Sequence, residues 1–175
     1  MPKKESLHFL KKEILSGEIN KMDNSEINND VIKKLLSSSK TIAMVGVSSV
    51  KKEDSTNIKR RPSIIVMEYL QEFGYRVIPV NPSAEGKKIN GEDVFARLKD
   101  IKVPIDVVNV FRPSNEAPFL ANETIEIGAK AIWLQYGIQS KDAEKIANSS
   151  NITYIANRCI KQEYQRLFLK VNPVF

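Results

Sequence analysis

The chain contains 175 residues, which at roughly 100 to 200 residues per domain predicts one domain with at most a small addition. Hydrophobic residues make up 42% and charged residues 27%, which is ordinary globular composition and excludes a disordered chain. No apolar run reaches the ~18 to 20 residues that a membrane span needs. Met1–Leu10 also lacks the apolar stretch of a signal peptide. We therefore expect a cytoplasmic protein with no membrane partner.

The single cysteine and the single histidine exclude several kinds of site. Cys159 cannot form an internal disulfide, and one thiolate cannot make a structural zinc site. His8 lies in a polar N-terminal stretch, so neither a Ser-His-Asp triad nor a Cys-His pair is expected. We expect no metal site and no catalytic residue.

The formal net charge of +6 favours an anionic partner, which could be nucleic acid, lipid or a phosphorylated small molecule. One segment clusters five basic residues, Lys51, Lys52, Lys59, Arg60 and Arg61, against the two acidic residues Glu53 and Asp54. This segment has no aromatic residue, whereas nucleic-acid-binding modules usually interleave aromatic side chains that stack on bases. The pattern therefore favours phosphate groups and disfavours nucleic acid.

The first part of the chain has a different pattern from the rest. A weak helical pattern runs from Leu7 to Leu15 and ends at Gly17, and a polar stretch follows. We interpret residues 1–29 as an N-terminal helical appendage or linker, and residues 30–175 as the domain. Asp30 is the expected N-cap of a short helix over residues 31–36.

From Thr41 onward, short apolar runs rich in β-branched residues alternate with stretches of helical spacing. Five runs predict strands, over residues 42–47, 75–80, 106–111, 129–134 and 152–155. Near-continuous hydrophobicity is typical of strands buried on both faces of a parallel sheet. Helices are expected over residues 63–73, 94–98, 115–127, 141–149 and 161–170. The alternation predicts an α/β fold with a Rossmann-like, doubly wound, five-stranded parallel sheet in the order 3-2-1-4-5.

Two of these helices carry clear end signals. Pro62 suits the first turn of one helix, and Gly74 and Gly128 suit the left-handed residue that follows a helix end. Ligands of such a fold bind at the carboxyl ends of the strands, so the residues just after each run are the candidate site.

The first strand ends in Gly46, Val47, Ser48 and Ser49, where backbone N–H groups and a helix N-terminus can hold phosphate. One glycine stands where the dinucleotide fingerprint G-x-G-x-x-G needs three, and there is no P-loop motif. A standard NAD or ATP site is therefore not supported. The alternative is that Gly46 makes a tight turn and the serines are simply solvated.

The connection from Ser48 to Arg61 is long for a β-to-α loop, which usually has about 2 to 6 residues. Arg60, Arg61 and Ser63 surround the expected helix start, where the helix dipole also favours negative charge. We interpret this segment as an anion clamp. A solvated loop is the alternative.

The second strand ends in Val80, Asn81 and Pro82, where an NAD enzyme would usually place an acidic residue for the ribose. Asn81 precedes proline, so the pair fixes a bend that can form one wall of an adenine-ribose site. A turn with nothing bound explains these residues equally well.

The remaining strand ends add Phe111, Arg112 and Gln135 to the candidate site. Arg112 is the most informative of these, because it places a charge beside a proline at the strand exit. We expect Trp133 to pack in the core. Glu163 and Arg166, three residues apart on the last helix, predict a surface ion pair.

Five segments together carry a resemblance to a known family. They are residues 42–48 (IAMVGVS), 74–82 (GYRVIPVNP), 106–112 (DVVNVFR), 133–137 (WLQYG) and 158–167 (RCIKQEYQRL). In order and spacing they resemble the single-domain CoA-binding proteins, which are Rossmann-like relatives of the N-terminal domain of the succinyl-CoA synthetase alpha subunit. The resemblance implies that Ser48 and the basic segment hold CoA phosphates and that Val80, Asn81 and Pro82 line the nucleotide. It also implies that Phe111, Arg112 and Gln135 border the cleft.

We therefore predict that the chain binds coenzyme A or an acyl-CoA at the strand ends and is not itself a catalyst, because no strand end offers a nucleophile or a positioned acid or base. One alternative is an oxidoreductase that uses a nicotinamide cofactor. Others are a CoA-binding subunit of an acyl-CoA synthetase, and a basic adaptor that binds nucleic acid or a protein through residues 51–61.

Overall fold

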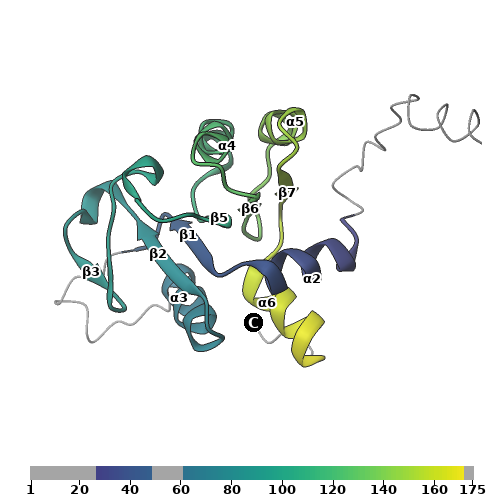
Figure 1. Ribbon diagram of the computed structural model, residues 1–175, viewed down its shortest axis with the longest axis horizontal. Coiled ribbons are helices and arrows are strands. Elements are labelled where there is room, and N and C mark those ends of the chain that lie inside the picture. The colour runs from purple at the N-terminus through teal and green to yellow at the C-terminus, as the bar shows by residue number, and fades with distance from the viewer. Residues whose placement is uncertain (1–26, 49–60, 172–175) are drawn as a thin grey trace, which may run out of the picture.

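A parallel sheet between two layers of helices forms the centre of the protein (Figure 1). The computed structural model describes residues 27–48 and 61–171. All neighbouring strands of the sheet are parallel, in the order β2-β1-β5-β6-β7. The strands are β1 (Thr41–Val45), β2 (Arg76–Val80), β5 (Val107–Val110), β6 (Ala131–Leu134) and β7 (Thr153–Ile155). The predicted Rossmann-like α/β fold is confirmed.

The predicted strand order, 3-2-1-4-5, is wrong. Numbered along the chain, the five strands lie in the order 2-1-3-4-5, because the third strand, β5, pairs with β1 and not with the outer edge of β2. That edge is occupied by Phe95, which forms a single parallel bridge with Val80. The Phe95 N–H donates to the Pro79 carbonyl oxygen at 3.1 Å. A one-residue bridge has no strand-like pattern, so residues 94–98 were expected to be helical.

Short elements fill the connection between β2 and β5. An antiparallel hairpin joins β3 (Lys88–Ile89) to β4 (Glu92–Asp93), and 3-10 turns cover Pro82–Ala84 and Leu98–Asp100. These turns and the Phe95 bridge replace the helix expected over residues 94–98.

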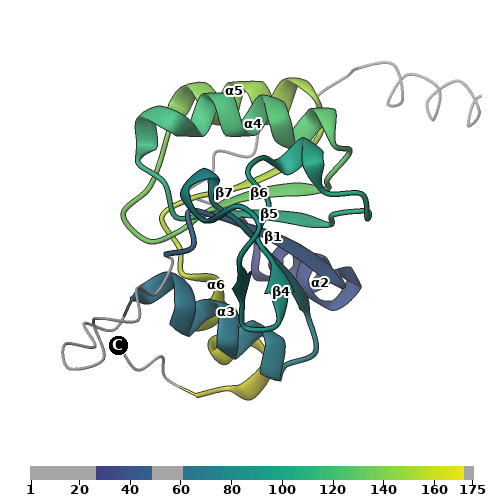
Figure 2. The same cartoon turned by 90° about the vertical axis from the view of Figure 1, so that its left-hand side faces the viewer.

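The helices form two layers, one on each face of the sheet (Figure 2). One layer contains α4 (Ala117–Glu126), preceded by a 3-10 turn at Ser114–Glu116, and α5 (Lys141–Ser149). The other contains α2 (Asn29–Ser38), α3 (Pro62–Glu72) and α6 (Ile160–Tyr164), which continues in a π-helical turn, Gln165–Leu169. Among the described residues, no helix combines the length and the apolar character needed to cross a membrane.

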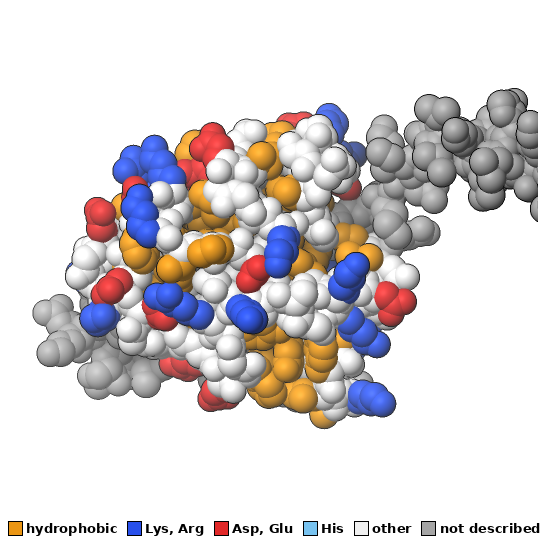
Figure 3. Space-filling model, in the orientation of Figure 1, with side chains coloured by type: hydrophobic (Ala, Val, Ile, Leu, Met, Phe, Trp, Pro, Cys, Tyr) orange, Lys and Arg blue, Asp and Glu red, His pale blue; other side chains and the backbone are white. Residues whose placement is uncertain are grey.

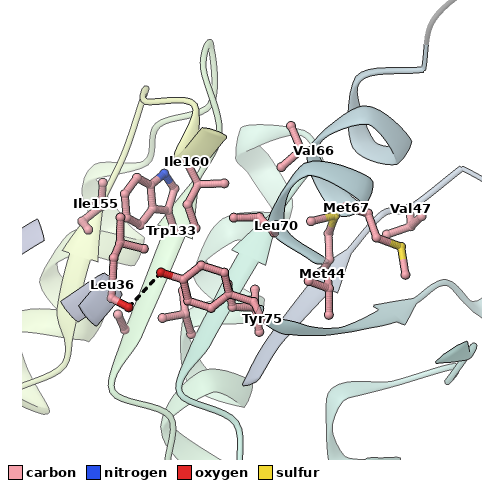
Figure 4. Close-up of a cluster of buried hydrophobic side chains, with 14 of the residues drawn as sticks. Leu36, Met44, Val47, Val66, Met67, Leu70, Tyr75, Trp133, Ile155 and Ile160 are labelled. Carbon is pink, nitrogen blue, oxygen red and sulfur yellow. Dashed lines mark hydrogen bonds between the residues drawn. The ribbon is translucent and has the colours of Figure 1, made fainter. Parts of the chain in front are cut away.

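Each strand is buried on both faces because its alternate residues enter different clusters. Met44 packs in the cluster under α2, α3 and α6, whereas its neighbours Ala43 and Val45 pack under α4 and α5. Figure 4 shows the first cluster, with Trp133 beside Ile160. Trp133 is fully buried, which confirms its expected place in the core. The continuous apolar runs therefore reflect two separate cores on one sheet.

The helix ends follow the sequence signals with one exception. Pro62 begins α3, and Gly74 and Gly128 follow α3 and α4 with φ of +89° and +71°. The N-cap of α2 is Asn28, whose side chain accepts a hydrogen bond from the Asp30 N–H, so the expected Asp30 cap is wrong. The helical pattern in residues 7–15 lies outside the described residues.

The predicted ion pair between Glu163 and Arg166 forms, with a nitrogen–oxygen distance of 2.6 Å. It is not a simple surface pair, because the Glu163 side chain is only 13% exposed and also lies 3.5 Å from Arg158. Arg166 donates a further hydrogen bond to the side-chain oxygen of Asn29. The pair therefore connects α6 and the π-helical turn that follows it to α2.

Candidate functional site

Three strand ends meet around Gly46 at the carboxyl edge of the sheet. The Gly46 N–H donates to the Val80 carbonyl oxygen at 2.9 Å, and the Phe111 N–H donates to the carbonyl oxygen of Val45 at 2.8 Å. Gly46 has a φ of +90°, and a Cβ atom there would lie 2.9 Å from Arg112 Cδ and 3.0 Å from the Phe111 oxygen. Only glycine allows the end of β1 to lie this close to the end of β5.

A cleft of about 400 Å³ opens at this edge, on the face of the sheet that α4 covers. The ends of β1, β2 and β5 form one wall of the cleft, and Phe119 and Leu120 of α4 line it from the other side. The cleft brings together most of the residues predicted for nucleotide binding, namely Gly46, Val47, Ser48, Val80, Asn81, Pro82 and Arg112. These positions are up to 66 residues apart in the sequence.

Hydrogen bonds fix the shape of the cleft near its polar wall. Asn81 donates from Nδ2 to the Val47 carbonyl oxygen at 2.8 Å, and its Oδ1 accepts from the Ser83 N–H at 2.9 Å. The Ser48 N–H donates to the Ser63 hydroxyl oxygen at 3.2 Å, which connects the end of β1 to the start of α3. Ser63 is buried, so it supports the cleft from behind. Asn81 likewise acts mainly as a support for the loop.

Arg112 enters the cleft as part of an ion pair. Its guanidinium donates two hydrogen bonds to the carboxylate of Glu116, at 2.9 and 2.6 Å. Both side chains remain partly exposed, at 47% and 38%. The hydrogen bonds from Arg112 lower the pKa of Glu116 despite the opposing effect of its partial burial. Glu116 therefore stays ionised and holds Arg112 in place at neutral pH.

Two further charged residues line the cleft and were missed in the sequence. Arg97 follows the Phe95 bridge and forms a bidentate pair with Asp100, with both distances 3.1 Å. Glu123 lies on α4, where burial is the main cause that raises its pKa. Arg97 lies in the segment wrongly expected to be helical, and nothing in the local pattern around Glu123 distinguishes it from a surface residue.

A second cavity, of about 570 Å³, opens on the opposite face of the sheet. Its walls are mainly apolar, and its lining comes from the start of α3, the ends of β5 and β6 and the start of α6. Two of the predicted site residues, Phe111 and Gln135, line it. The other lining side chains include Ile65, Val66, Tyr136, Ile138 and Cys159. Tyr136 and Cys159 follow strand ends, so strand-end position was the available signal for them.

Gln135 and Asn109 form a buried polar pair in the middle of the sheet edge. The Gln135 side-chain nitrogen donates to Asn109 Oδ1 at 2.6 Å, and the two residues are 4% and 0% exposed. Asn109 Nδ2 has no partner among the described residues. The remaining side-chain oxygen of Gln135 likewise accepts no hydrogen bond from them. Gln135 lines the apolar cavity, so this oxygen can accept a hydrogen bond from a ligand there.

The basic segment lies largely outside the described residues, including Ser49, Arg60 and the lysines of the predicted anion clamp. Arg61 is described and stands at the N-cap position of α3. Within residues 27–48 and 61–171, no group of three or more His, Cys, Asp or Glu side chains could hold a metal ion.

The parallel sheet, the glycine turn after β1 and the cleft at the carboxyl edge together define a Rossmann-like α/β protein. Residues 40–165 match the family model for the CoA binding domain, and the chain belongs to this family. The uncharacterized protein YneT of Bacillus subtilis (strain 168) is 38% identical over 130 residues, which cover 74% of this chain and 89% of YneT.

Two solved structures have similar folds and sequences. The structure of cell-free ID.343 from Thermus thermophilus has a TM-score of 0.71 and 37% identity, covering 81% of this chain and 100% of that one. A hypothetical protein from Pyrococcus horikoshii OT3 has a TM-score of 0.70 and 33% identity, covering 81% and 92%. A dinucleotide-forming acetyl-coenzyme A synthetase from Ca. Korarchaeum cryptofilum, at 20% identity and a TM-score of 0.51, shares the fold; the match covers 67% of this chain and 26% of that one.

Proposed function

We propose that the protein binds coenzyme A or an acyl-CoA at the carboxyl edge of its sheet and serves as a binding protein without catalytic activity of its own. The observation that carries this proposal is the cleft around Gly46, which lies at the carboxyl edge of the sheet, where ligands bind in open α/β folds, and within the residues that match the CoA binding domain. Its 400 Å³ lies within the ~300 to 1,000 Å³ typical of small-molecule sites.

In this proposal the nucleotide part of CoA lies in the cleft. Val80, Asn81 and Pro82 form the wall beside the adenine and ribose, and the hydroxyl of Ser48 donates to a phosphate. Arg112 supplies a guanidinium for a further phosphate oxygen, which suits the planar fork of arginine. Gly46 lets the ligand approach the backbone closely.

The charges of the described cleft nearly cancel, because Arg97 and Arg112 face Glu116 and Glu123. A ligand with several phosphate charges needs more positive potential than this. The basic residues of the segment after β1 would supply it, and we therefore keep Ser49, Arg60 and Arg61 in the proposed site.

The pantetheine arm would leave the cleft over the ends of β5 and β6. Its amide N–H groups need acceptors, and the free side-chain oxygen of Gln135 is placed at this edge. The absence of a catalytic role is inferred from the sequence, since His8 is the only histidine and lies outside the family match.

Thermal unfolding with added ligands tests the proposal. A ligand that binds only the folded state stabilises it by RT ln(1 + [L]/Kd), which is about 2.7 kcal/mol at a hundredfold excess over Kd. We expect CoA to raise the melting temperature, and NAD, NADP and a short DNA duplex at equal concentration to leave it unchanged. An equal shift with NAD would support the nicotinamide alternative instead.

A pair of matched variants links that shift to the cleft. Arg112→Gln should reduce the CoA-dependent shift, because it removes a charge-assisted contact to phosphate. Arg76→Gln is the control, since Arg76 also forms a bidentate pair with a glutamate but lies at the start of β2, away from the cleft. If both variants bind CoA like the wild type, the nucleotide does not lie against Arg112.

A further inference from the structure

The apolar cavity on the α3 side of the sheet shares no lining residue with the cleft proposed for the nucleotide. Its volume of about 570 Å³ is larger than that of the charged cleft and is again typical of a small-molecule site. Ile65, Val66, Phe111 and Ile138 contribute side chains to its walls that neither donate nor accept hydrogen bonds. A group that lies against these four side chains is best matched when it is apolar, although Gln135, Lys161 and Gln162 also line the cavity.

The cavity adjoins the proposed nucleotide site at the end of β5. Phe111 and Arg112 are consecutive, but Phe111 lines the apolar cavity and packs against the core on the α3 side, whereas Arg112 lines the charged cleft. Gly46 also lines the cleft, and a Cβ atom at this position would lie only 3.0 Å from the Phe111 carbonyl oxygen. A ligand that passes over this point extends from one face of the sheet to the other.

We propose that the apolar cavity binds the acyl chain of an acyl-CoA, so that the protein prefers thioesters of aliphatic acids to free CoA. This proposal rests on the proposed function. The pantetheine arm is a poorer occupant of these walls, because its two amide groups would lose hydrogen bonds to water there. Gln135, the buried residue with a free acceptor, can satisfy one amide before the chain enters. The acyl chain needs no such partner.

The chain length should therefore control affinity. Burying one methylene group tightens binding about fourfold, so each step of two methylenes should tighten it about fifteenfold while the chain still fits. Isothermal titration with CoA, acetyl-CoA, butyryl-CoA and hexanoyl-CoA measures this dependence. We expect the dissociation constants to fall in that order from acetyl-CoA to hexanoyl-CoA.

Cys159 provides an independent readout, because it lines the cavity and is the only cysteine of the chain. Alkylation of Cys159 by iodoacetamide can be followed by mass spectrometry in the presence of bound thioesters. Thioesters, unlike free CoA, have no free thiol that would itself react with iodoacetamide. At equal site occupancy, hexanoyl-CoA should slow the alkylation more than acetyl-CoA does. Equal rates with both thioesters would place the acyl chain outside the cavity.

Two matched substitutions locate the effect. Ile65→Trp fills the cavity from α3, while Ile146→Trp makes the same change at another half-buried helical isoleucine, on α5 and away from both cavities. The affinity ratio of hexanoyl-CoA to acetyl-CoA should fall toward one in Ile65→Trp and remain high in Ile146→Trp. Ile138→Trp, from another wall, serves if Ile65→Trp does not fold.

The possible failures are distinguishable. If CoA and all the thioesters bind with equal affinity, the acyl site is overturned while the proposed function stands. If none of them binds, both proposals fall. A chain-length dependence that survives both Ile65→Trp and Ile138→Trp would also overturn this location for the acyl chain.

Discussion

Glu116 binds the guanidinium of Arg112, which the proposed phosphate site needs. The variant Glu116→Gln tests the effect of this contact on CoA binding. In the folded protein, Nε and Nη2 of Arg112 both donate hydrogen bonds to the Glu116 carboxylate. A bound phosphate must share or displace that carboxylate, and it is also repelled by it. We expect Glu116→Gln to bind CoA more tightly than the wild type.

The size of the gain is limited by the exposure of the pair. With side chains 47% and 38% exposed, solvent screens the interaction, and such pairs contribute about 0.3 to 1 kcal/mol. Releasing Arg112 can therefore tighten CoA binding by about two- to fivefold. The free energy of unfolding should fall by no more than about 1 kcal/mol in the same variant.

The pH dependence of the pair has a defined sign. Hydrogen bonds from Arg112 lower the pKa of Glu116 in the folded state, so the pair stabilises the protein above the ordinary glutamate pKa. This contribution is lost as the pH falls through the lowered pKa. At pH 7 the ion pair between Arg112 and Glu116 is intact in the wild type. Titration calorimetry at this pH therefore compares the CoA affinity of the wild type with that of Glu116→Gln, in which Arg112 is released from the carboxylate.

A double-mutant cycle tests the mechanism directly. If Glu116 acts through Arg112, the change Glu116→Gln should have little effect on CoA affinity in an Arg112→Gln background. Glu92→Gln is the matched control, because Glu92 forms a similar bidentate pair with Arg76 away from the cleft. Weaker or unchanged CoA binding by Glu116→Gln in the wild-type background would refute the reasoning.

Two predictions concern stability and can be measured by urea unfolding. Gly46→Ala should lower the free energy of unfolding by about 3 kcal/mol, because a left-handed φ and close contacts with the β5 end both oppose a Cβ atom. Gly86→Ala is the control. Gly86 has a φ of +76° but no atom within 4 Å of an added Cβ, so this change should lower the free energy of unfolding by only about 1 kcal/mol. Tyr75→Phe should cost about 1 to 3 kcal/mol, because it removes the buried hydrogen bond to the Leu36 carbonyl oxygen drawn in Figure 4. Burial, followed by the nearby Tyr164, raises the pKa of Tyr75 to about 12, so its contribution is complete below pH ~10 and is lost as the pH rises through about 12. Between pH ~10 and about 12, the free energy of unfolding should therefore fall less in Tyr75→Phe than in the wild type. Equal losses would contradict a stabilising role for the Tyr75 hydroxyl.

Charged side chains of both signs are mixed on one face of the protein. On the face drawn in Figure 3, lysine and arginine side chains are interspersed with aspartate and glutamate. A surface that binds nucleic acid through its backbone usually gathers basic residues on one face or along one groove. On this face of the described residues, the charges therefore lack the single-sign basic patch that is typical of a nucleic-acid-binding surface.

The local pattern of the sequence determined the elements and much of the cleft. Apolar runs buried on both faces identified the five strands, and Pro62, Gly74 and Gly128 marked the helix ends because their backbone preferences act within one turn. The strand ends at Gly46, Asn81 and Arg112 were identified as candidates for the same reason, since any parallel sheet brings its carboxyl ends to one edge.

The tertiary structure alone decided the strand order, the pairing of the charges and the second cavity. Phe95 forms a single bridge at the outer edge of β2, and β5 pairs with β1 on the side away from β2. Glu116 neutralises Arg112 through a contact whose geometry depends on the turn before α4. The apolar cavity forms from segments up to about 100 residues apart, which are Pro62–Val66, Phe111, Gln135–Ile138 and Cys159–Gln162. Such features depend on which remote surfaces pack together, and local periodicity carries no information about that packing.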